Sequence, residues 1–217
     1  KSDVEQNVAT TDDVAIATAK GWKVFDYTGG ENYGMGVKYE GSEPTGPVFP
    51  EEYFTITSEG GSRLMLTSVF SDPDYTPLLE NCTLSGWNGS TLTIAIESGK
   101  PATIYGDAIT IQAPFSVVTA IDVTNTPNLA ELNLALDDIT TIDLSKSAKL
   151  QTLSVEGCYL STIDLSKCAE LNYLNCYGNQ IAGEGMTAMV KSLPDRTGAA
   201  TGQLIVTPDN GTLTHIK

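Results

Sequence analysis

Two tyrosines and an asparagine are the strongest candidates for binding a ligand. Tyr173, Asn175 and Tyr177 alternate along one short segment, so in a strand all three would point to the same face. Aromatic rings beside an amide suit the recognition of a sugar ring or a protein hot spot. An ordinary solvated sheet surface is the alternative interpretation. The remaining residues predicted for this surface are Glu131, Asn133, Thr152, Ser154 and Glu156.

The sequence contains few combinations of side chains that could catalyse a reaction. The only histidine, His215, lies three residues from the end of the sequence, which disfavours a Ser-His-Asp or Cys-His arrangement. Acidic residues number 27, so pairs of carboxylates arise from composition alone. No glycine-rich segment has the spacing and the Lys-Ser/Thr pair of a phosphate loop. We therefore expect no enzyme and no cofactor.

Three aspartates recur at one spacing and form the most tempting metal site. Asp122, Asp143 and Asp164 would stack about 4.8 Å apart in a parallel arrangement, where like charges repel. Lys146 and Lys167 follow three residues later and can relieve this repulsion. A calcium or magnesium site is one interpretation. Hydrogen bonding of the carboxylates to backbone amides is the one we favour.

The four cysteines are predicted to be mainly free thiols. Cys158 and Cys176 fall where small buried groups are expected, and Cys168 corresponds to Ser147 and Thr126 in neighbouring segments. An even number of cysteines could form disulfides, but these positions disfavour that interpretation. No Cys-x-x-Cys pair or paired histidine is present, which argues against a zinc site.

The elements that must position these residues are copies of one motif with a period of 21 residues. The spacing predicts a solenoid of stacked coils whose strands form a parallel sheet on one face. The positions that repeat are Ile121, Ile142 and Ile163; Leu129, Leu150 and Leu171; Leu132, Leu153 and Leu174; Leu134, Val155 and Cys176; and Ile139, Leu160 and Ile181.

Each copy reads Leu-x-x-Leu-x-apolar, and its last three residues alternate in, out, in as a strand requires. Three residues later come Asp137, Cys158 and Asn179, where a side chain can turn inward and bond the backbone of the bend. A copy of 21 residues has no room for a long helix. The return segments should therefore be extended or short 3₁₀ turns.

The segment from Ile163 to Ile181, IDLSKCAELNYLNCYGNQI, resembles the short leucine-rich repeats of bacterial surface proteins, the internalin-like group. It is most similar to versions found in surface lipoproteins of gut anaerobes. Asn179 is the standard residue at the turn position, Cys158 is the known alternative, and Asp137 departs from the pattern. The resemblance covers residues 109–217 and implies a solenoid, a bacterial source and an extracytoplasmic location, at the cell surface or outer membrane. An anchor would lie outside this sequence.

Residues 1–26 are predicted to form a helix and strand that resemble a repeat cap. Thr10 or Thr11 can cap the helix, Gly21 ends it, and Trp22 to Phe25 reads as a strand. Similar segments usually close this type of protein at its C-terminal end. We hypothesise that residues 10–25 extend a sheet within one chain or between chains, which would allow self-association.

Residues 27–108 lack the period and are predicted to form a small antiparallel β unit, with a sandwich as one possible form. Asn88 and Gly89 indicate a hairpin. The expected strands are 36–39, 53–57, 63–68, 79–84, 91–97 and 102–105.

Residues 109–217 are predicted to form the repeat domain with a helix-strand C-terminal cap. Ile109 and Ile111 are matched to Leu132 and Leu134, which leaves two excess residues near Pro114, and a sheet continuous with the β unit is expected. Met186, Met189, Val190 and Leu193 fit one helical face, and a strand is predicted at 204–206. The fold class is therefore mostly β with few helices.

The negative charge of the chain disfavours some classes of binding partner. The formal net charge is −15, so nucleic acid and anionic membrane surfaces are disfavoured, and no apolar run is long enough to span a membrane. We expect a non-catalytic binding module for adhesion, secreted or held at the cell surface, that recognises protein or glycan through the exposed sheet face. The alternative is a structural or spacer component of a surface assembly.

Overall fold

The computed structural model describes residues 15–17, 19–20, 25–26, 37–38, 49–59, 63–72 and 74–206. The chain divides into two compact units, residues 1–48 and 49–217. In the first unit, residues 15–17 and 19 are helical, and β1 (Phe25–Asp26) pairs antiparallel with β2 (Val37–Lys38). The cap-like segment predicted at 10–25 falls largely outside the described residues.

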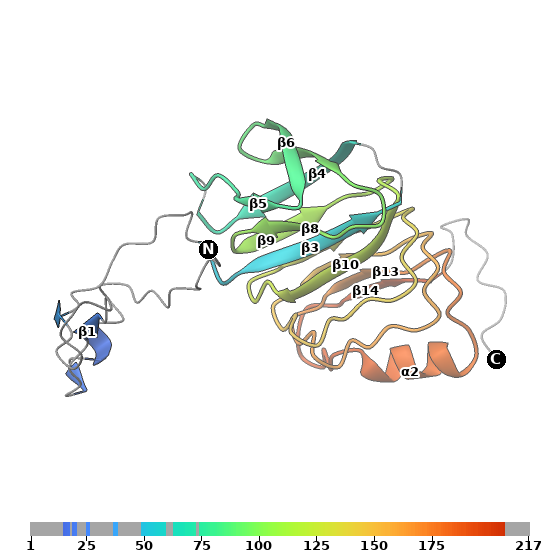
Figure 1. Ribbon diagram of the computed structural model, residues 1–217. Coiled ribbons are helices and arrows are strands. Elements are labelled where there is room, and N and C mark those ends of the chain that lie inside the picture. The colour runs from blue at the N-terminus through green and yellow to red at the C-terminus, as the bar shows by residue number, and fades with distance from the viewer. Residues whose placement is uncertain are drawn as a thin grey trace. The chain divides into compact units, whose positions relative to one another are not determined.

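The second unit contains two sheets (Figure 1). The larger has eight strands in the order β14-β13-β12-β11-β9-β4-β7-β6, and the smaller has four in the order β10-β3-β8-β5. The bounds are β3 (Tyr53–Ser58), β4 (Arg63–Phe70), β5 (Leu79–Glu80), β6 (Cys82–Trp87), β7 (Thr91–Ile96), β8 (Ala102–Tyr105), β9 (Ala108–Gln112), β10 (Val118–Asn125), β11 (Glu131–Asn133), β12 (Thr152–Ser154), β13 (Tyr173–Asn175) and β14 (Gln203–Ile205).

The predicted solenoid is confirmed. Strands β11, β12 and β13 pair in parallel, and the register places Leu132 opposite Leu153 and Leu153 opposite Leu174. All three leucines are buried and form a single interior column. Each of these strands satisfies its backbone groups against the strands of the two neighbouring coils, so no coil is stable alone.

The antiparallel unit is also confirmed, but the single strand expected at 79–84 was wrong, because Asn81 at φ 58° divides it into β5 and β6, which lie in different sheets. Strands β6 and β7 form the expected hairpin, whose turn is closed by the Asn88 side chain accepting from the amides of Ser90 and Thr91. The strands alternate buried and partly exposed residues, as in β7 with Leu92 and Ile94 inward. The inward residues of both sheets join one hydrophobic core, so the two sheets form a sandwich.

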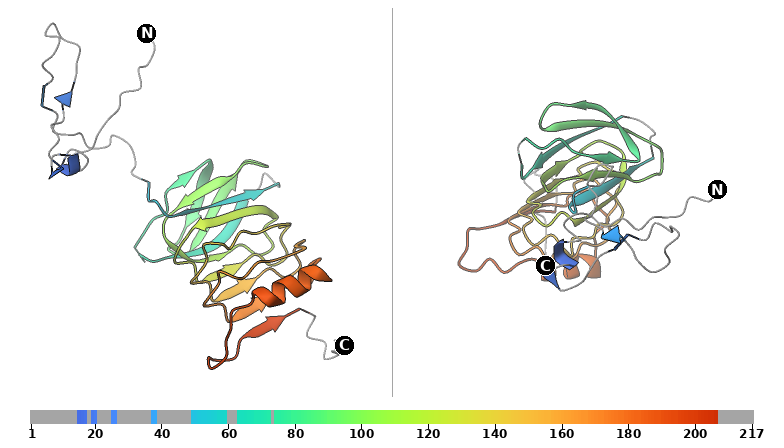
Figure 2. Two further views of the ribbon diagram at one scale, coloured as in Figure 1. Left: turned by 90° about the horizontal axis from the view of Figure 1, so that it is seen from below. Right: turned by 60° about the vertical axis from the view of Figure 1, so that its left-hand side comes forward.

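The sandwich continues into the solenoid along both sheets (Figure 2, left). On one side, β9 pairs antiparallel with β4 of the sandwich and parallel with β11 of the solenoid. On the other side, β10 is the return segment of the first coil and pairs antiparallel with β3. The expected continuous sheet is therefore present, and a second continuous sheet accompanies it.

The predicted register of the first coil was wrong by two residues. Leu132 lies opposite Ile111, so the equivalent of Leu134 is Ala113 and the equivalent of Leu132 is Ile111, not Ile109. The interval from Ile111 to Ile121 is then 10 residues, as in the next coil from Leu132 to Ile142. With this register, the first coil has no excess residues near Pro114. Ala113 is fully buried, but its small side chain gave no apolar signal.

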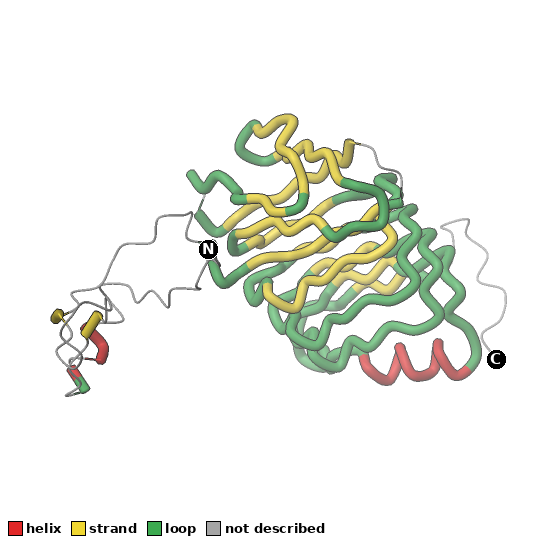
Figure 3. Tube along the Cα trace, in the orientation of Figure 1, coloured by secondary structure: helices red, strands yellow, loops and turns green. Residues whose placement is uncertain are grey.

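The return segments of the later coils contain no strand or long helix, as expected (Figure 3). After the last coil, α2 (Glu184–Ser192) buries Met189 against the core, and β14 adds a further parallel strand to β13. Met186 and Leu193 pack partly against the core, whereas Val190 is exposed. The helix therefore contacts the core along a narrower stripe than the four apolar residues suggested.

Candidate functional site

The predicted binding residues lie together on the outer face of the solenoid sheet. We call this surface the pad and define it by the residues that follow. Glu131, Asn133, Thr152, Ser154, Glu156, Tyr173, Asn175 and Tyr177 make up the pad. Six of the eight are outward residues of β11, β12 and β13, and Glu156 and Tyr177 follow two residues after β12 and β13. Seven of the eight are partly exposed. Asn175 is an exception, with only 9% of its surface exposed.

Hydrogen bonds between coils fix the polar groups of the pad. The side-chain amide of Asn175 donates to Glu156 at 2.8 Å, and its oxygen accepts from the Tyr177 amide at 3.3 Å. In the first coils, Gln112 of β9 donates to Glu131. Asn175 is therefore a supporting residue that orients Glu156 and the backbone of Tyr177. The hydroxyls of Tyr173 and Tyr177 have no hydrogen-bond partner in the described parts of the chain.

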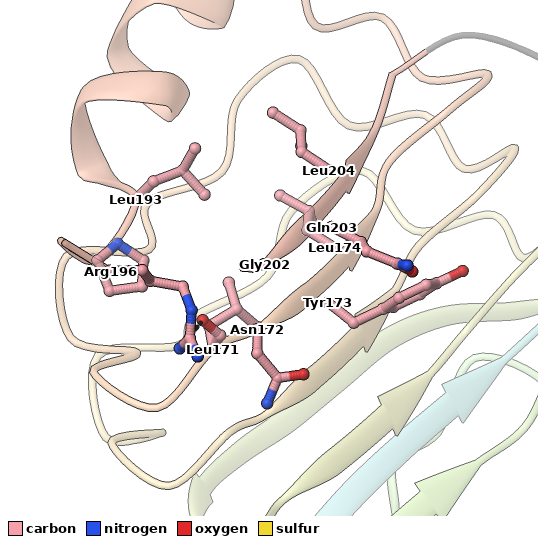
Figure 4. Close-up of a pocket in the computed structure, with 10 residues that line it drawn as sticks. Leu171, Asn172, Tyr173, Leu174, Leu193, Arg196, Gly202, Gln203 and Leu204 are labelled. Atoms are coloured by element: carbon pink, nitrogen blue, oxygen red, sulfur yellow. Dashed lines mark hydrogen bonds between the residues drawn. The ribbon is translucent and has the colours of Figure 1, made fainter. Parts of the chain in front are cut away.

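A pocket of about 210 Å³ adjoins the pad at the last strand (Figure 4). Its apolar lining comes mainly from Leu171, Leu193 and Leu204, and its polar lining includes Tyr173, Gln203 and Arg196. Tyr173 and Gln203 are paired neighbours on β13 and β14, and their side chains extend in the same direction, away from Arg196. Tyr173 thus belongs to both the pad and the pocket lining.

Arg196 holds the loop that closes one side of this pocket. Its Nε donates to the carbonyl of Ala200 at 2.9 Å, and Nη1 donates to the carbonyl of Leu171 at 3.2 Å. The bond to Ala200 braces the loop between α2 and β14 internally, and the bond to Leu171 ties that loop to the last coil. Sequence reasoning missed Arg196 and Gln203 because they follow the last repeat. The only available signal was rarity, since Arg196 is one of two arginines in the chain.

The repeating aspartates are bound to the backbone, as favoured from sequence. Each accepts from the amide two residues later: Asp122 from Thr124, Asp143 from Ser145 and Asp164 from Ser166. The Ser145 amide lowers the pKa of Asp143, and the Ser166 amide does the same for Asp164. In the parts of the chain that the structure describes, no group of three or more His, Cys, Asp or Glu side chains could hold a metal ion.

The four cysteines are free thiols, as predicted for most of them. Cys158, Cys168 and Cys176 are buried, and Cys82 is partly buried. Burial raises the pKa of Cys82 and of Cys168 to about 11. Neutral thiols in the core are poor nucleophiles at neutral pH. His215 lies outside the described residues, so the expectation that it has no catalytic role stays a prediction.

No helix of the described residues has the length and apolar character needed to cross a membrane. No family model matches this chain, and searches of curated proteins and of solved structures gave no match either.

Proposed function

We propose that this protein is a non-catalytic binding module that recognises a glycan or a protein through the pad and the adjoining pocket. Its repeats belong, in this proposal, to the short leucine-rich type of bacterial surface proteins. The protein would act outside the cytoplasm, held at the surface by an anchor such as that of a lipoprotein. Adhesion is the role that fits such a module.

The observation that carries the proposal is the pairing of free aromatic rings with fixed polar groups. Tyr173 and Tyr177 are partly exposed and keep unbonded hydroxyls, while Asn175 and Glu156 are bonded to one another. Side chains that are ordered before binding lose less conformational entropy when a ligand arrives. The pocket beside Tyr173 adds a concave end to an otherwise flat surface.

The test compares binding to a glycan array, and to purified extracellular proteins, by the wild type and by tyrosine variants. We expect Tyr173→Ala and Tyr177→Ala each to weaken binding about tenfold or more, as truncation of a central aromatic residue does. Tyr159→Ala is a matched control, because Tyr159 is an exposed tyrosine of the same solenoid outside the pad. A double variant that binds its ligand as the wild type does would place the site elsewhere.

A second candidate function is that of a structural spacer in a surface assembly. Its support is the junction at β9 and β10, where both sheets run without interruption from sandwich to solenoid. Such a body resists bending between its parts and suits a fixed separation of neighbouring modules. Light scattering over a range of protein concentrations distinguishes the candidates, because a monomer at every concentration contradicts self-assembly.

A further inference from the structure

The turns after β11, β12 and β13 are each closed by one inward side chain. The residues at this position are Asp137, Cys158 and Asn179, spaced 21 apart. Asn179 fills it with an amide: its nitrogen donates to the carbonyl of Val155 at 2.6 Å, and its oxygen accepts from the Leu160 amide at 3.0 Å. Cys158 donates its thiol to the carbonyl of Leu134 at 3.1 Å. Both side chains therefore give a proton to the carbonyl 24 residues earlier.

Asp137 matches Asn179 on the accepting side only. Its Oδ1 accepts from the amides of Ser116 at 2.8 Å and Val118 at 3.2 Å, and Val118 precedes Asp137 by 19 residues, as Leu160 precedes Asn179. Its Oδ2 is buried and has no hydrogen-bond partner. The residue as a whole is 1% exposed, so water does not compensate for the missing bond.

The backbone carbonyl 24 residues before Asp137 also lacks a hydrogen-bond donor. Counting back 24 residues from Asp137 gives Ala113, the equivalent of Leu134 and Val155. No described residue donates a hydrogen bond to the Ala113 carbonyl, although the Ala113 amide is bonded to Asn133. Two buried acceptors thus remain unsatisfied at one turn, and each such group is costly. A single proton between them would satisfy both.

We propose that Asp137 folds as the neutral acid and that its Oδ2–H donates to the carbonyl of Ala113, forming a pH-sensitive clasp where the sandwich meets the solenoid. A protonated carboxyl can donate one hydrogen bond and still accept others, which is the pattern of the Asn179 amide. Raising the pH releases the proton to water and leaves a buried carboxylate facing a carbonyl oxygen.

The surroundings of Asp137 favour the neutral form. The neighbouring charged and titratable groups are Asp138 on its own turn and the Cys158 thiol of the next coil, and neither is a cation. Burial raises the pKa of Asp137 to about 6, against the opposing effect of the amides from Ser116 to Val118. Since the ordinary value is 3.8, the clasp contributes fully below about pH 4 and is lost as the pH rises through about 6.

The clasp acts on an unusual segment. The turn from Pro114 to Val118 holds Phe115 at φ 60° and Val117 at φ 58°, conformations that side-chain-bearing residues rarely adopt. Phe115 is 72% exposed. Loss of the clasp releases the Ala113 carbonyl at the start of this strained turn, while Oδ1 still accepts from the amides of Ser116 and Val118.

The test measures urea unfolding of the wild type, Asp137→Asn and Asp138→Asn between pH 5 and pH 8. With pKa values of about 6 folded and 3.8 unfolded, the wild-type unfolding constant should rise about tenfold more than that of Asp137→Asn. Asp137→Asn places at residue 137 the same amide that Asn179 has, which can donate to the Ala113 carbonyl at any pH. This variant should therefore be more stable than the wild type at pH 8. Asp138→Asn removes the adjacent exposed carboxyl and should keep the wild-type dependence.

A second measurement needs no variant. The ¹³C resonance of the Asp137 carboxyl in the folded wild type should titrate with a midpoint near pH 6. A midpoint at or below 4 would mean that the carboxylate is the native form and would overturn the clasp. Equal pH profiles for the wild type and Asp137→Asn would overturn it as well.

Discussion

At the scale of single residues, the turn after each parallel strand requires a left-handed backbone at one residue of every coil. The φ values at this position are 60° for Phe115, 62° for Leu136, 65° for Gly157 and 75° for Gly178. Glycine adopts this conformation without strain, whereas a residue with a side chain is strained by about 1 to 2 kcal/mol. The Leu136 side chain lies over Gly157, where a Cβ would be 2.3 Å from its Cδ2.

Replacing Gly157 by alanine should therefore lower stability for two reasons. Backbone strain contributes about 1 kcal/mol, and the contact with Leu136 adds to it. Urea unfolding of Gly157→Ala gives the sum. The matched control is Gly99→Ala, because Gly99 has a similar φ of 69° and open space around it. If both substitutions cost the same, the Leu136 contact contributes nothing to the loss.

At the scale of elements, the solenoid depends on the interior leucine column. Leu153→Ala removes the middle member, between two coils that cannot collapse without losing register, so a loss of about 2 to 5 kcal/mol in unfolding free energy is expected. Leu204 of β14 pairs with Leu174 at the end of the column and is 40% exposed, so Leu204→Ala should cost clearly less. Chemical denaturation measures the loss of unfolding free energy in both variants. Similar losses would contradict the expectation that the buried leucine contributes more than the exposed one.

The sequence predicted the elements that follow a period and missed those that do not. Leu132, Leu153 and Leu174 gave the strands, their register and the outward face of the pad, because alternation in a strand determines which side chains face water. Ala113 hid the true register of β9, since a small side chain carries little apolar signal. The second pairing, of β10 with β3, joins residues about 65 apart, and no local pattern reports such a contact.

The candidate site was predictable to the same extent. Tyr173 and Tyr177 were placed on the outward face from spacing alone, but the burial of Asn175 depends on its bond to Glu156 in the preceding coil. The pocket depends on the loop between α2 and β14, where Arg196 is held by carbonyls of Ala200 and Leu171. That loop follows no repeat, so its course could not be derived from the period.

At the scale of the whole second unit, two continuous sheets should make sandwich and solenoid unfold together. Both share one hydrophobic core, and neither end of the junction offers a hinge. In a Trp22→Phe background, fluorescence of Trp87 reports the sandwich, and pulsed labelling of the Cys168 thiol reports the solenoid. The two urea midpoints should coincide. Separate midpoints would show that sandwich and solenoid are independent folding units.

The junction at β9 and β10 has a further consequence for how such a chain can change in length. The first coil pairs antiparallel with the sandwich on one side, and on the other side its strand β9 presents the same parallel edge that each later coil presents to its successor. It can therefore act as a template from which coils are added in whole steps of about 4.8 Å. In-frame duplication of one 21-residue copy would move the terminal pocket away from the sandwich by one such step. The sandwich itself would be unaltered.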